Sequence, residues 1–201
     1  MKTGRLIIAI TGASGAIYAV RFLKRAARIW DHLYIALSEQ AAQVAATELG
    51  IQVDRTAPTS LAFLGEEHEN ITFLDRKDFF SPPASGSFRH DGMVIIPCSM
   101  GTLGRIANGI SDDLVTRAAD VCLKERRPLI LVPRETPLNL VHLRNMTALT
   151  EAGAVILPAC PGFYFNPKSI EELTDTVISR VFQQLGVELE DMPQWQYTEE
   201  N

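Results

Sequence analysis

The residues best suited to chemistry follow short apolar runs, and the first of them form the stretch Thr11-Gly12-Ala13-Ser14-Gly15. Backbone amides at a glycine-rich turn into a helix bind anions, and a serine hydroxyl adds a further donor. The spacing departs from the dinucleotide pattern G-x-G-x-x-G, because Ser14 and Ile17 stand where the second and third glycines belong. Ser38 follows the next apolar run in place of the acidic residue that binds a ribose, and no Gly-Lys-Ser/Thr occurs. The pattern therefore favours a mononucleotide such as FMN over NAD or a nucleoside triphosphate.

More hydroxyl and charged groups follow the other apolar runs. The stretch C-S-M-G-T at 98–102 follows one run, the pair Arg134-Glu135 follows a second, and Tyr164 follows the last. Ligands of open α/β sheets bind at the carboxyl ends of the strands, where such segments meet. We therefore expect these side chains to converge on one binding site.

Two other chemistries fit the sequence less well. Ser14 lies in a near match to the hydrolase motif G-x-S-x-G, but Ala16 replaces the final glycine and no strand exit supplies a histidine base. The three cysteines form no C-x-x-C pair and the four histidines lack metal-ligand spacing. We expect reduced structural thiols and no protein-bound metal.

The elements that must position these residues alternate along the chain. Apolar runs predict strands, most of them covered on both faces, at 5–10, 32–37, 71–74, 92–97, 128–132 and 154–158. Helical spacing predicts helices at 16–29, 39–49, 103–108, 112–125, 138–152 and 169–185, and 79–87 reads as an ordered loop. This alternation predicts an α/β fold with a doubly wound parallel sheet and right-handed crossovers.

Length and composition set the remaining bounds. The 201 residues predict one domain at 1–186, followed by an acidic tail at 187–201 whose Trp195 and Tyr197 need a packing partner such as a neighbouring subunit. A net charge of −5 without a basic block argues against nucleic-acid binding. No apolar run approaches the ~20 residues of a membrane span, and no signal-peptide pattern precedes the first strand. We expect a cytoplasmic protein that binds neither nucleic acid nor membrane.

Six motifs lie in register along most of the chain: T-G-A-S-G-A at 11–16, S-P-P-A-S-G-S at 81–87, P-C-S-x-G-T-L at 97–103, R-A-A-D-V-x-L-K-E-R-R-P-L at 117–129, L-V-P-R-E-x-P at 131–137 and G-A-V-I-L-P-A-x-P-G-F-Y at 153–164. Together they resemble the UbiX/Pad1-type flavin prenyltransferases. The resemblance implies a flavodoxin-like, Rossmann-type three-layer subunit in a homododecamer. It implies transfer of a dimethylallyl group from dimethylallyl monophosphate to reduced FMN, at N5 and C6, with release of phosphate and without a metal. The prenylated FMN would then serve UbiD-type decarboxylases, including those of ubiquinone synthesis.

The same resemblance implies roles for individual residues. Glu135 would be the acid/base residue, with Ser14 and Glu48 in support. The implied FMN contacts are Gly12, Ala13, Ser14, Ser38, Ser99, Met100, Gly101, Thr102 and Arg134. The implied prenyl-phosphate contacts are Ser85, Arg117, Lys124, Tyr164 and Arg180, with Trp195 closing the site.

Three of these residues are hard to place in one subunit. Glu48 follows Ser38 by ten residues, which is about 15 Å along a helix. Arg117 and Lys124 lie on a helix that, with Asp113 and Asp120, is typical of a solvated ion-pair face. We therefore expect neighbouring subunits to complete the site.

Three positions depart from the pattern of the family, and other functions fit parts of the sequence. Asp113 stands where the family often has Asn, Ala19 replaces a common Gly, and Cys160 occupies a variable position. The alternatives are an FMN-dependent cysteine-type decarboxylase, whose P-x-M-N-x-x-M-W signature is missing here, a non-catalytic flavin-binding subunit of a decarboxylase, and an aromatic-acid decarboxylase in its own right. A pyrophosphate donor could replace the monophosphate.

Overall fold

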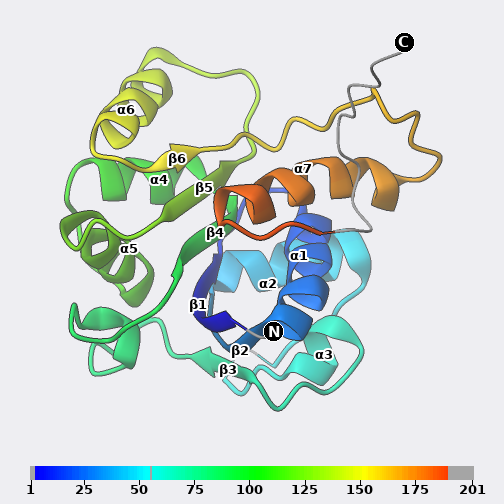
Figure 1. Cartoon of the computed structure of the whole chain (residues 1–201), viewed down its shortest axis with the longest axis horizontal. Coiled ribbons are helices and arrows are strands. Elements are labelled where there is room, and N and C mark those ends of the chain that lie inside the picture. The colour runs from blue at the N-terminus through cyan, green and yellow to red at the C-terminus, as the bar shows by residue number, and fades with distance from the viewer. Residues whose placement is uncertain (1–2, 55, 190–201) are drawn as a thin grey trace, which may run out of the picture.

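The computed structural model describes residues 3–54 and 56–189, which form a six-stranded sheet between two layers of helices (Figure 1). The elements in chain order are β1 (Thr3–Ile10), α1 (Ala16–Ile29), β2 (Trp30–Leu37), α2 (Glu39–Leu49), α3 (Ser60–Leu64), β3 (Ile71–Leu74), the 3-10 turn η1 (Pro82–Ala84), β4 (Gly92–Cys98), α4 (Met100–Ala107), α5 (Leu114–Lys124), β5 (Leu129–Pro133), α6 (Leu140–Glu151), β6 (Val155–Ile156) and α7 (Ile170–Gln184).

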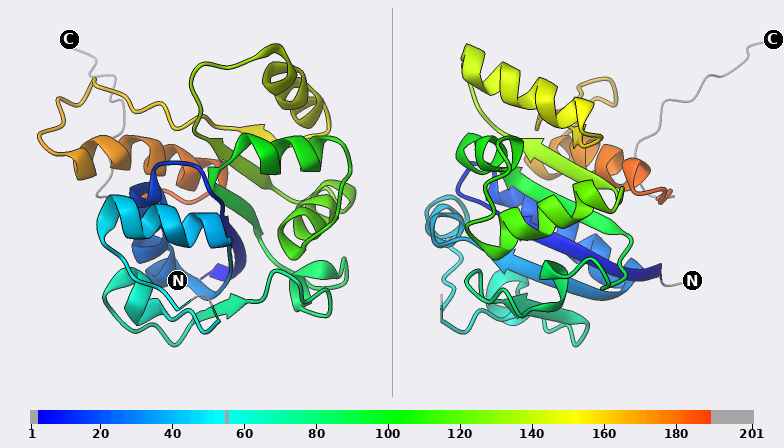
Figure 2. Two further views of the ribbon diagram at one scale, coloured as in Figure 1. Left: turned by 180° about the vertical axis from the view of Figure 1, so that it is seen from behind. Right: turned by 90° about the vertical axis from the view of Figure 1, so that its left-hand side faces the viewer.

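All strand pairs of the sheet are parallel, and the strand order is β3-β2-β1-β4-β5-β6. This order confirms the predicted doubly wound sheet and is that of Rossmann-type folds. The chain reverses its direction of growth between β1 and β4, so the loops after these two strands diverge to opposite faces. Figure 2 shows helices on both faces of the sheet. A crevice for a ligand is expected at this switch point.

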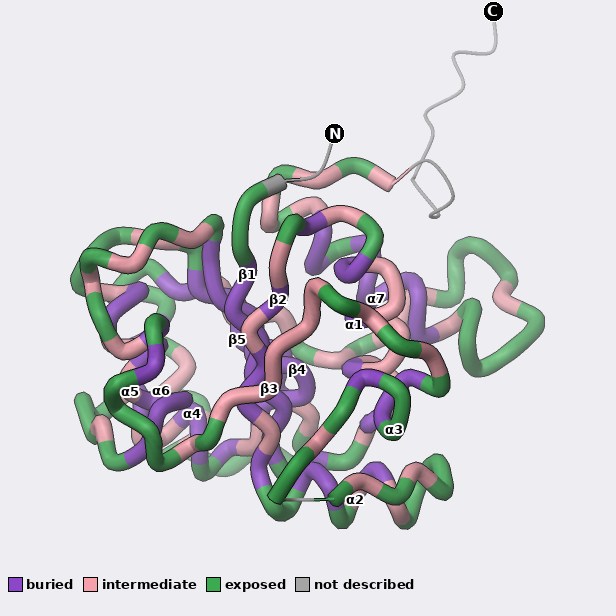
Figure 3. Tube along the Cα trace, turned by 90° about the horizontal axis from the view of Figure 1, so that it is seen from below, coloured by how far each residue is buried: buried purple, intermediate pink, exposed green. Residues whose placement is uncertain are grey.

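Each face of the sheet has its own hydrophobic cluster. The first cluster joins the sheet to α1, α3 and α7, and the second joins it to α4 and α5 with Leu149 of α6. The central strands β4 and β5 are buried along their whole length (Figure 3). Their continuous apolar runs are therefore explained by helices on both sides.

Aromatic packing and a buried carboxylate fix α7 on α1. The buried ring of Phe182 lies 4.9 Å from the ring of Phe22 and 6.0 Å from that of Trp30. Asp175 of α7, also buried, accepts hydrogen bonds from Arg21 and Arg25 of α1. The apolar positions of α1 recur three and four residues apart, which gives this helix one face for the sheet and α7.

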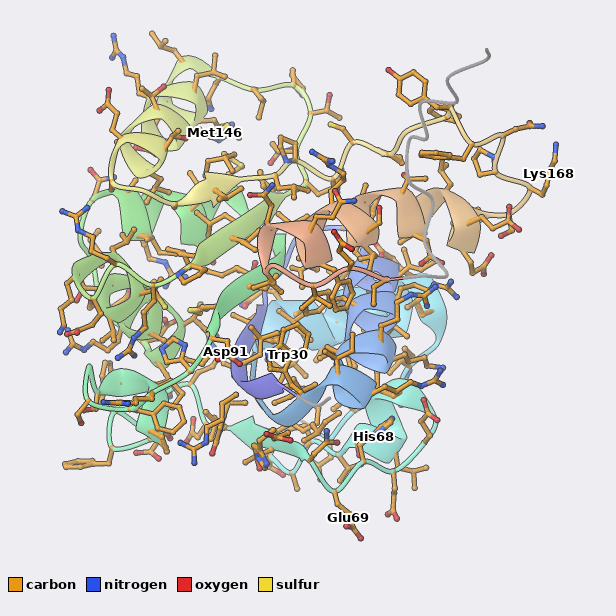
Figure 4. All side chains as sticks on the ribbon, in the orientation of Figure 1. Trp30, His68, Glu69, Asp91, Met146 and Lys168 are labelled. Carbon is orange, nitrogen blue, oxygen red and sulfur yellow. The ribbon has the colours of Figure 1, made fainter. Side chains whose placement is uncertain are left out.

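A further hydrogen bond ties Trp30 Nε1, at the start of β2, to Asp91 Oδ2, just before β4, at 3.1 Å; both side chains are labelled in Figure 4.

Three elements differ from the sequence prediction. Helix α3 was not expected, although Thr59 caps its start and Gly65 ends it in a left-handed conformation, as in other helices. Helix α4 begins at Met100, three residues early, because Ser99 Oγ accepts the Thr102 amide. Strand β6 has two residues, but the amides of Leu157 and Ala159 continue to bond β5. The 3-10 turn η1 lies inside the loop predicted at 79–87.

The described start of the C-terminal tail packs on this chain itself. Val187 and Leu189 contact the first hydrophobic cluster. Trp195 and Tyr197, for which a neighbouring subunit was expected, lie outside the described residues. None of the helices in 3–54 and 56–189 combines the length and the apolar character that a bilayer span requires.

We expect Phe182→Ala to lower the free energy of unfolding by about 3–5 kcal/mol, because it leaves a cavity between the two helices and Trp30. Denaturant titration at one protein concentration measures this change. Ile170→Ala is the control on the same helix, since Ile170 is exposed, and should stay within about 0.5 kcal/mol of the wild type. Equal effects of the two substitutions would contradict the packing described above.

Candidate functional site

A cavity of about 310 Å³ opens at the carboxyl ends of β1, β2 and β4. We name it the switch-point cavity. It is lined by Thr11, Gly12, Ser38, Gln40, Arg76, Ser99, Gly101, Thr102 and Arg105. Five of these residues are predicted FMN contacts. Ala13 and Met100, also predicted, have buried side chains, so only their backbone is available to a ligand there.

Thr11 ties together the two loops that border this cavity. Its hydroxyl donates to the carbonyl of Pro97 at 2.9 Å and accepts the amide of Ser99 at 2.8 Å. The Thr11 amide also bonds the Pro97 carbonyl, at 3.2 Å. Thr11 is buried, so these bonds are shielded from water. The exits of β1 and β4 are thus held in one fixed arrangement.

Two helices point their N-termini at the switch-point cavity. Ser38 caps α2 by accepting the amide of Ala41 at 2.9 Å, and Ser99 caps α4 by accepting the amide of Thr102 at 3.3 Å. Each cap uses one of the amides that lack a partner in the first helical turn, and others remain for a ligand. The partial positive charges of both N-termini favour an anion in this cavity.

Gly12 is required by a close approach of the first loop to α2. A Cβ atom at this position would lie 2.4 Å from the Cβ of Gln40, which no side chain tolerates. The glycine therefore lets the loop pass over the first turn of α2. Gly101 differs, because a Cβ there would meet nothing within 4 Å.

The N-terminus of α1, which the glycine pattern suggested as an anion site, is engaged by a carboxylate of the protein itself. The carboxylate of Glu48 already accepts the amides of Gly15 and Ala16, at 2.8–3.0 Å. A pyrophosphate in the position used by dinucleotide-binding folds would have to displace this carboxylate. The N-termini of α2 and α4 are therefore better placed to receive an anion.

The prediction that Glu48 reaches a site from a neighbouring subunit is wrong, because its carboxylate contacts the first loop of its own chain. The prediction assumed that α2 runs away from the edge of the sheet. Helix α2 instead lies across this edge, and its last turn meets the start of α1 (Figure 1). Helix α2 thus returns Glu48, ten residues after Ser38, to the first loop of its own chain.

Glu48 belongs to a small polar cluster with Ser14 and Arg134. Burial raises the pKa of Glu48, but hydrogen bonds from the Ser14 hydroxyl and from the amides of Ala16 and Gly15 outweigh it, and Arg134 adds an attractive charge. The pKa of Glu48 therefore lies below its ordinary value, and its side chain is a carboxylate at neutral pH. Arg134 Nε donates to the Ser14 carbonyl at 3.1 Å, which brings the end of β5 to the same loop.

Glu135 is exposed at the end of β5, directly after Arg134. Its Oε1 accepts the amide of Thr136 at 3.0 Å. Within the described part of the chain, Oε2 makes no hydrogen bond. One oxygen of the side chain is thus held by the backbone of the next residue.

A second cavity, of about 430 Å³, lies between β6 and α7, and Tyr164, Arg180 and Cys160 are among its lining residues. We name it the β6–α7 cavity. The Gly162 amide donates to Thr176 Oγ1 at 2.9 Å, which fixes the loop of Tyr164 on α7. Arg180 NH1 donates to Gln183 Oε1 at 2.7 Å and is exposed. Two predicted prenyl-phosphate contacts therefore share one cavity.

The other three described residues of that set form a separate cluster. Arg117 Nε donates to the carbonyl of Ala84 at 3.1 Å, beside Ser85, and Lys124 pairs with Glu125 close to Gly86. This cluster lies on α5 and η1, on the far side of the molecule from the loop at 160–170 (Figures 1 and 2). One subunit therefore does not bring all the predicted contacts together. Trp195, the sixth, lies outside the described residues.

Four residues of the switch-point cavity were not predicted from the sequence, namely Thr11, Gln40, Arg76 and Arg105. Thr11 was quoted within the glycine stretch but assigned no role. Arg76 follows β3 in the least regular part of the chain, and its contact with Asp113, 37 residues away, has no local signal.

Two of the three cysteines are buried, and the third is exposed. Cys98 and Cys122 are buried, burial raises the pKa of each thiol to about 12, and both are structural as predicted. Cys160 is exposed instead and lines the β6–α7 cavity. Among the residues that the structure describes, no three His, Cys, Asp or Glu side chains gather as metal ligands would.

Known proteins resemble this chain over nearly its full length. The sequence model of the family described as Flavoprotein matches residues 1–183. The flavin prenyltransferase UbiX of Pseudomonas aeruginosa is 44% identical over 195 residues, which cover 95% of this chain and 93% of that protein. The UbiX of Methanothermobacter thermautotrophicus is 44% identical over 190 residues, with 94% of each chain covered.

Solved structures agree in fold. AnUbiX, determined in complex with FMN and dimethylallyl pyrophosphate, has a TM-score of 0.85 and 37% identity, covering 98% of this chain and all of that one. A dodecameric FMN-dependent UbiX-like decarboxylase from Escherichia coli O157:H7 has a TM-score of 0.86 and 36% identity, covering 96% of this chain and all of that one. The peptidyl-cysteine decarboxylase EpiD, at 19% identity and a TM-score of 0.58, shares the fold alone.

We expect Glu48→Gln to lower the thermal midpoint of unfolding at pH 7, because it removes the charge that the α1 amides and Arg134 stabilise. The pKa of Glu48 is lowered in the folded state, so this stabilisation is complete above the ordinary value of 4.5 and is lost as the pH falls through the folded pKa. The midpoints of wild type and variant should therefore converge below pH 4.5. Thermal scans from pH 7 downward measure the gap.

Glu69→Gln is the matched control, since this exposed side chain points away from the molecule (Figure 4). Its midpoint should follow that of the wild type at every pH. A gap between Glu48→Gln and the wild type that stays constant as the pH falls would contradict the role of the charge.

Proposed function

The chain belongs to the Flavoprotein family and to its UbiX-type flavin prenyltransferases, and from this premise we propose which of its residues carry the reaction. The protein joins a dimethylallyl group to FMN, using reduced FMN and dimethylallyl monophosphate and releasing phosphate. We assign FMN to the switch-point cavity. The hydroxyls of Ser38, Ser99 and Thr102 and the N-termini of α2 and α4 converge on this cavity, and this convergence supports the assignment.

The residues of this cavity fit a mononucleotide. Ser38, Ser99 and Thr102 offer hydroxyls, and α2 and α4 offer amides, to a phosphate monoester. Ser38 and Glu48 lie at opposite ends of α2, about 15 Å apart. An elongated ligand with its phosphate at Ser38 therefore places its other end beside Ser14, Glu48 and Arg134. Gly12 lets the first loop lie low enough over α2 for such a ligand to cross it.

FMN, when bound, supplies the two ring positions, N5 and C6, to which the prenyl group is joined. Joining at C6 requires a proton to leave, and Glu135 is the carboxylate that takes it. Its Oε1 is engaged by the Thr136 amide, so Oε2 holds the proton. Arg134 orients the neighbouring loop through the Ser14 carbonyl, and Glu48, kept as a carboxylate, orients the Ser14 hydroxyl.

The β6–α7 cavity binds the prenyl phosphate. Arg180 and Tyr164 line it and offer a guanidinium and a phenol to the phosphate. Charge grows on the phosphate as its bond to the allylic carbon breaks, and fixed donors lower the barrier by stabilising that charge. The aromatic face of Tyr164 also favours the allylic group as it becomes cationic.

A second copy of the chain completes this site. Ser85, Arg117 and Lys124 form their own cluster away from the β6–α7 cavity, so they reach the phosphate from a neighbouring subunit. A dodecameric relative supports an assembly in which such sites form between copies. The prenylated FMN then passes to a UbiD-type decarboxylase, and the whole reaction takes place in the cytoplasm.

The names of two similar solved structures favour a second function, decarboxylation. The dodecameric relative is called a decarboxylase, and a structure from Aquifex aeolicus, 34% identical with a TM-score of 0.80, is called a phenylacrylic acid decarboxylase. Decarboxylation of an aromatic acid by this chain alone is therefore the alternative that the experiment must separate. The cysteine-type decarboxylases share only the fold.

Reduced FMN and dimethylallyl monophosphate, incubated with the protein and excess chelator without oxygen, should yield a flavin heavier by one prenyl unit together with free phosphate. The reason is that Arg180, Tyr164 and the hydroxyls supply the donors that a metal would otherwise provide. Mass spectrometry and a phosphate assay measure the products. Glu135→Gln should still bind FMN but should form less than about a hundredth of the mature product, in the range of a lost acid/base group.

Further arms of this experiment decide between the functions. Product formed only with added divalent metal, or FMN returned unchanged, would overturn the proposed reaction. Conversion of an aromatic acid by the protein without a UbiD-type partner would favour the decarboxylase instead. A dimethylallyl pyrophosphate arm shows which donor is preferred.

Subunit mixing should reveal sites shared between copies. Arg117→Ala and Arg180→Ala should each raise the prenyl phosphate requirement about ten- to hundredfold, because each loses a charge-assisted contact. Oligomers assembled from equal amounts of the two variants should recover about a quarter of the wild-type activity, since chance places both intact arginines in about a quarter of shared sites. Turnover at limiting substrate measures this recovery.

Oligomers of wild type with the double variant Arg117→Ala/Arg180→Ala are the control. Shared sites again give about a quarter of full activity, whereas sites within one subunit give about a half. No recovery in the first mixture, together with a half in the second, would show that each subunit works alone.

A further inference from the structure

Two arginines, Arg76 and Arg105, line the switch-point cavity. Arg76 follows β3, and Arg105 lies on α4, yet both line this cavity and a larger one of about 660 Å³ beside it. Both are half-buried, with 25% and 31% of their side chains exposed. The two arginines therefore stand between the switch-point cavity and the open groove next to it.

A buried carboxylate holds the two arginines in place. Asp113, which caps α5, pairs with Arg76 and lies 3.6 Å from Arg105 NH1. Arg105 NH1 also meets Asp112 at 3.1 Å, but this aspartate is exposed and contributes little. Burial raises the pKa of Asp113, but the amide and hydroxyl of Thr116 and the guanidinium of Arg76 lower it by more. The pKa of Asp113 therefore lies below its ordinary value, and the side chain is charged. Asp113 thus anchors the arginines rather than repelling a ligand.

The ion pairs with Asp113 leave other N–H groups of Arg76 and Arg105 available to a ligand. A guanidinium has five N–H groups in one plane, and a carboxylate on one edge leaves the others directed elsewhere. Arg76 Nε is buried and has no hydrogen-bond partner among the described residues. Arg105 NH2 lies 3.3 Å from Thr102 Oγ1, inside the cavity. A buried donor without an acceptor is costly, and an anion in this cavity would relieve that cost.

Arg105 also orients the hydroxyl of Thr102. Thr102 Oγ1 accepts from Ser99 Oγ at 3.1 Å and from Arg105 NH2 at 3.3 Å. A hydroxyl has two acceptor sites and one proton, so its proton is left to donate. Thr102 is buried at the start of α4, and the amides of that helix turn donate in the same region. The cavity therefore presents a set of fixed donors at this wall.

We propose that Arg105 and Arg76, anchored by Asp113, recognise the phosphate monoester of FMN and make the site selective for FMN over riboflavin. This inference rests on the proposed function, because it assigns the phosphate end of FMN to the switch-point cavity. Arg105 contacts the phosphate and also acts as a positioning residue through Thr102. Neither arginine is part of the motifs that the sequence shares with flavin prenyltransferases.

Equilibrium titration of the full oligomer with FMN and with riboflavin, followed by flavin fluorescence, tests the inference. Arg105→Ala should raise the Kd of FMN about ten- to hundredfold and leave that of riboflavin within about twofold, because only FMN carries the phosphate. Arg105→Lys keeps the charge but not the planar donors, so its Kd for FMN should lie between the two. Arg28→Ala, an exposed arginine in the last turn of α1, is the control and should change neither Kd.

The outcomes separate this inference from the proposed function. Equal weakening of FMN and riboflavin binding by Arg105→Ala, or no change in either, would overturn the phosphate contact while FMN binding by the wild type upholds the proposed function. A wild type that binds no FMN would overturn both. Arg76→Ala gives a second measure of the same selectivity, provided that circular dichroism shows the folded protein.

Discussion

The hydroxyl of Thr11 makes the connection on which the site depends. The strand order forces the loops after β1 and β4 to opposite faces of the sheet, and a crevice opens between them. Thr11 bridges that crevice at its base by donating to Pro97 and accepting from Ser99. Ser99 in turn caps α4, so this bridge also sets where the helix begins. Each such bond contributes only about 1 kcal/mol to stability, but burial gives it one geometry.

Helix N-termini at the same edge of the sheet offer two places for an anion, one at α1 and one at α2 and α4. Rossmann-type folds offer the N-terminus of the first helix to a phosphate, and here the protein fills that place with its own Glu48. The carboxylate is fixed by two amides and the Ser14 hydroxyl, which keeps it charged. The N-termini of α2 and α4 then become the free positive ends, and Arg76 and Arg105 stand beside them. One fold thereby serves a mononucleotide rather than a dinucleotide.

The proposed prenyl-phosphate site is organised differently from the proposed flavin site. The flavin side is built from strand exits, which the sheet holds rigidly within one chain. Tyr164 depends instead on a loop that is tied to α7 by Thr176, and Arg180 lies on α7, which depends on its contacts with α1. The cluster of Arg117 lies on another helix altogether. Such a division suits an enzyme whose second substrate is bound between copies of the chain.

The sequence by itself determined the alternation of elements, most of their bounds, and the hydroxyl groups that gather at the strand exits. Those features are local, because an apolar run, a capping serine or a terminating glycine acts within a few residues. Tertiary structure alone decided three things. Helix α2 lies across the edge of the sheet, which carries Glu48 to the amides of Gly15 and Ala16. Asp113 meets Arg76 across 37 residues of chain, because the start of α5 bonds the loop after β3. The direction in which a helix leaves a strand and the pairing of distant charges are set by packing, and no local pattern encodes them.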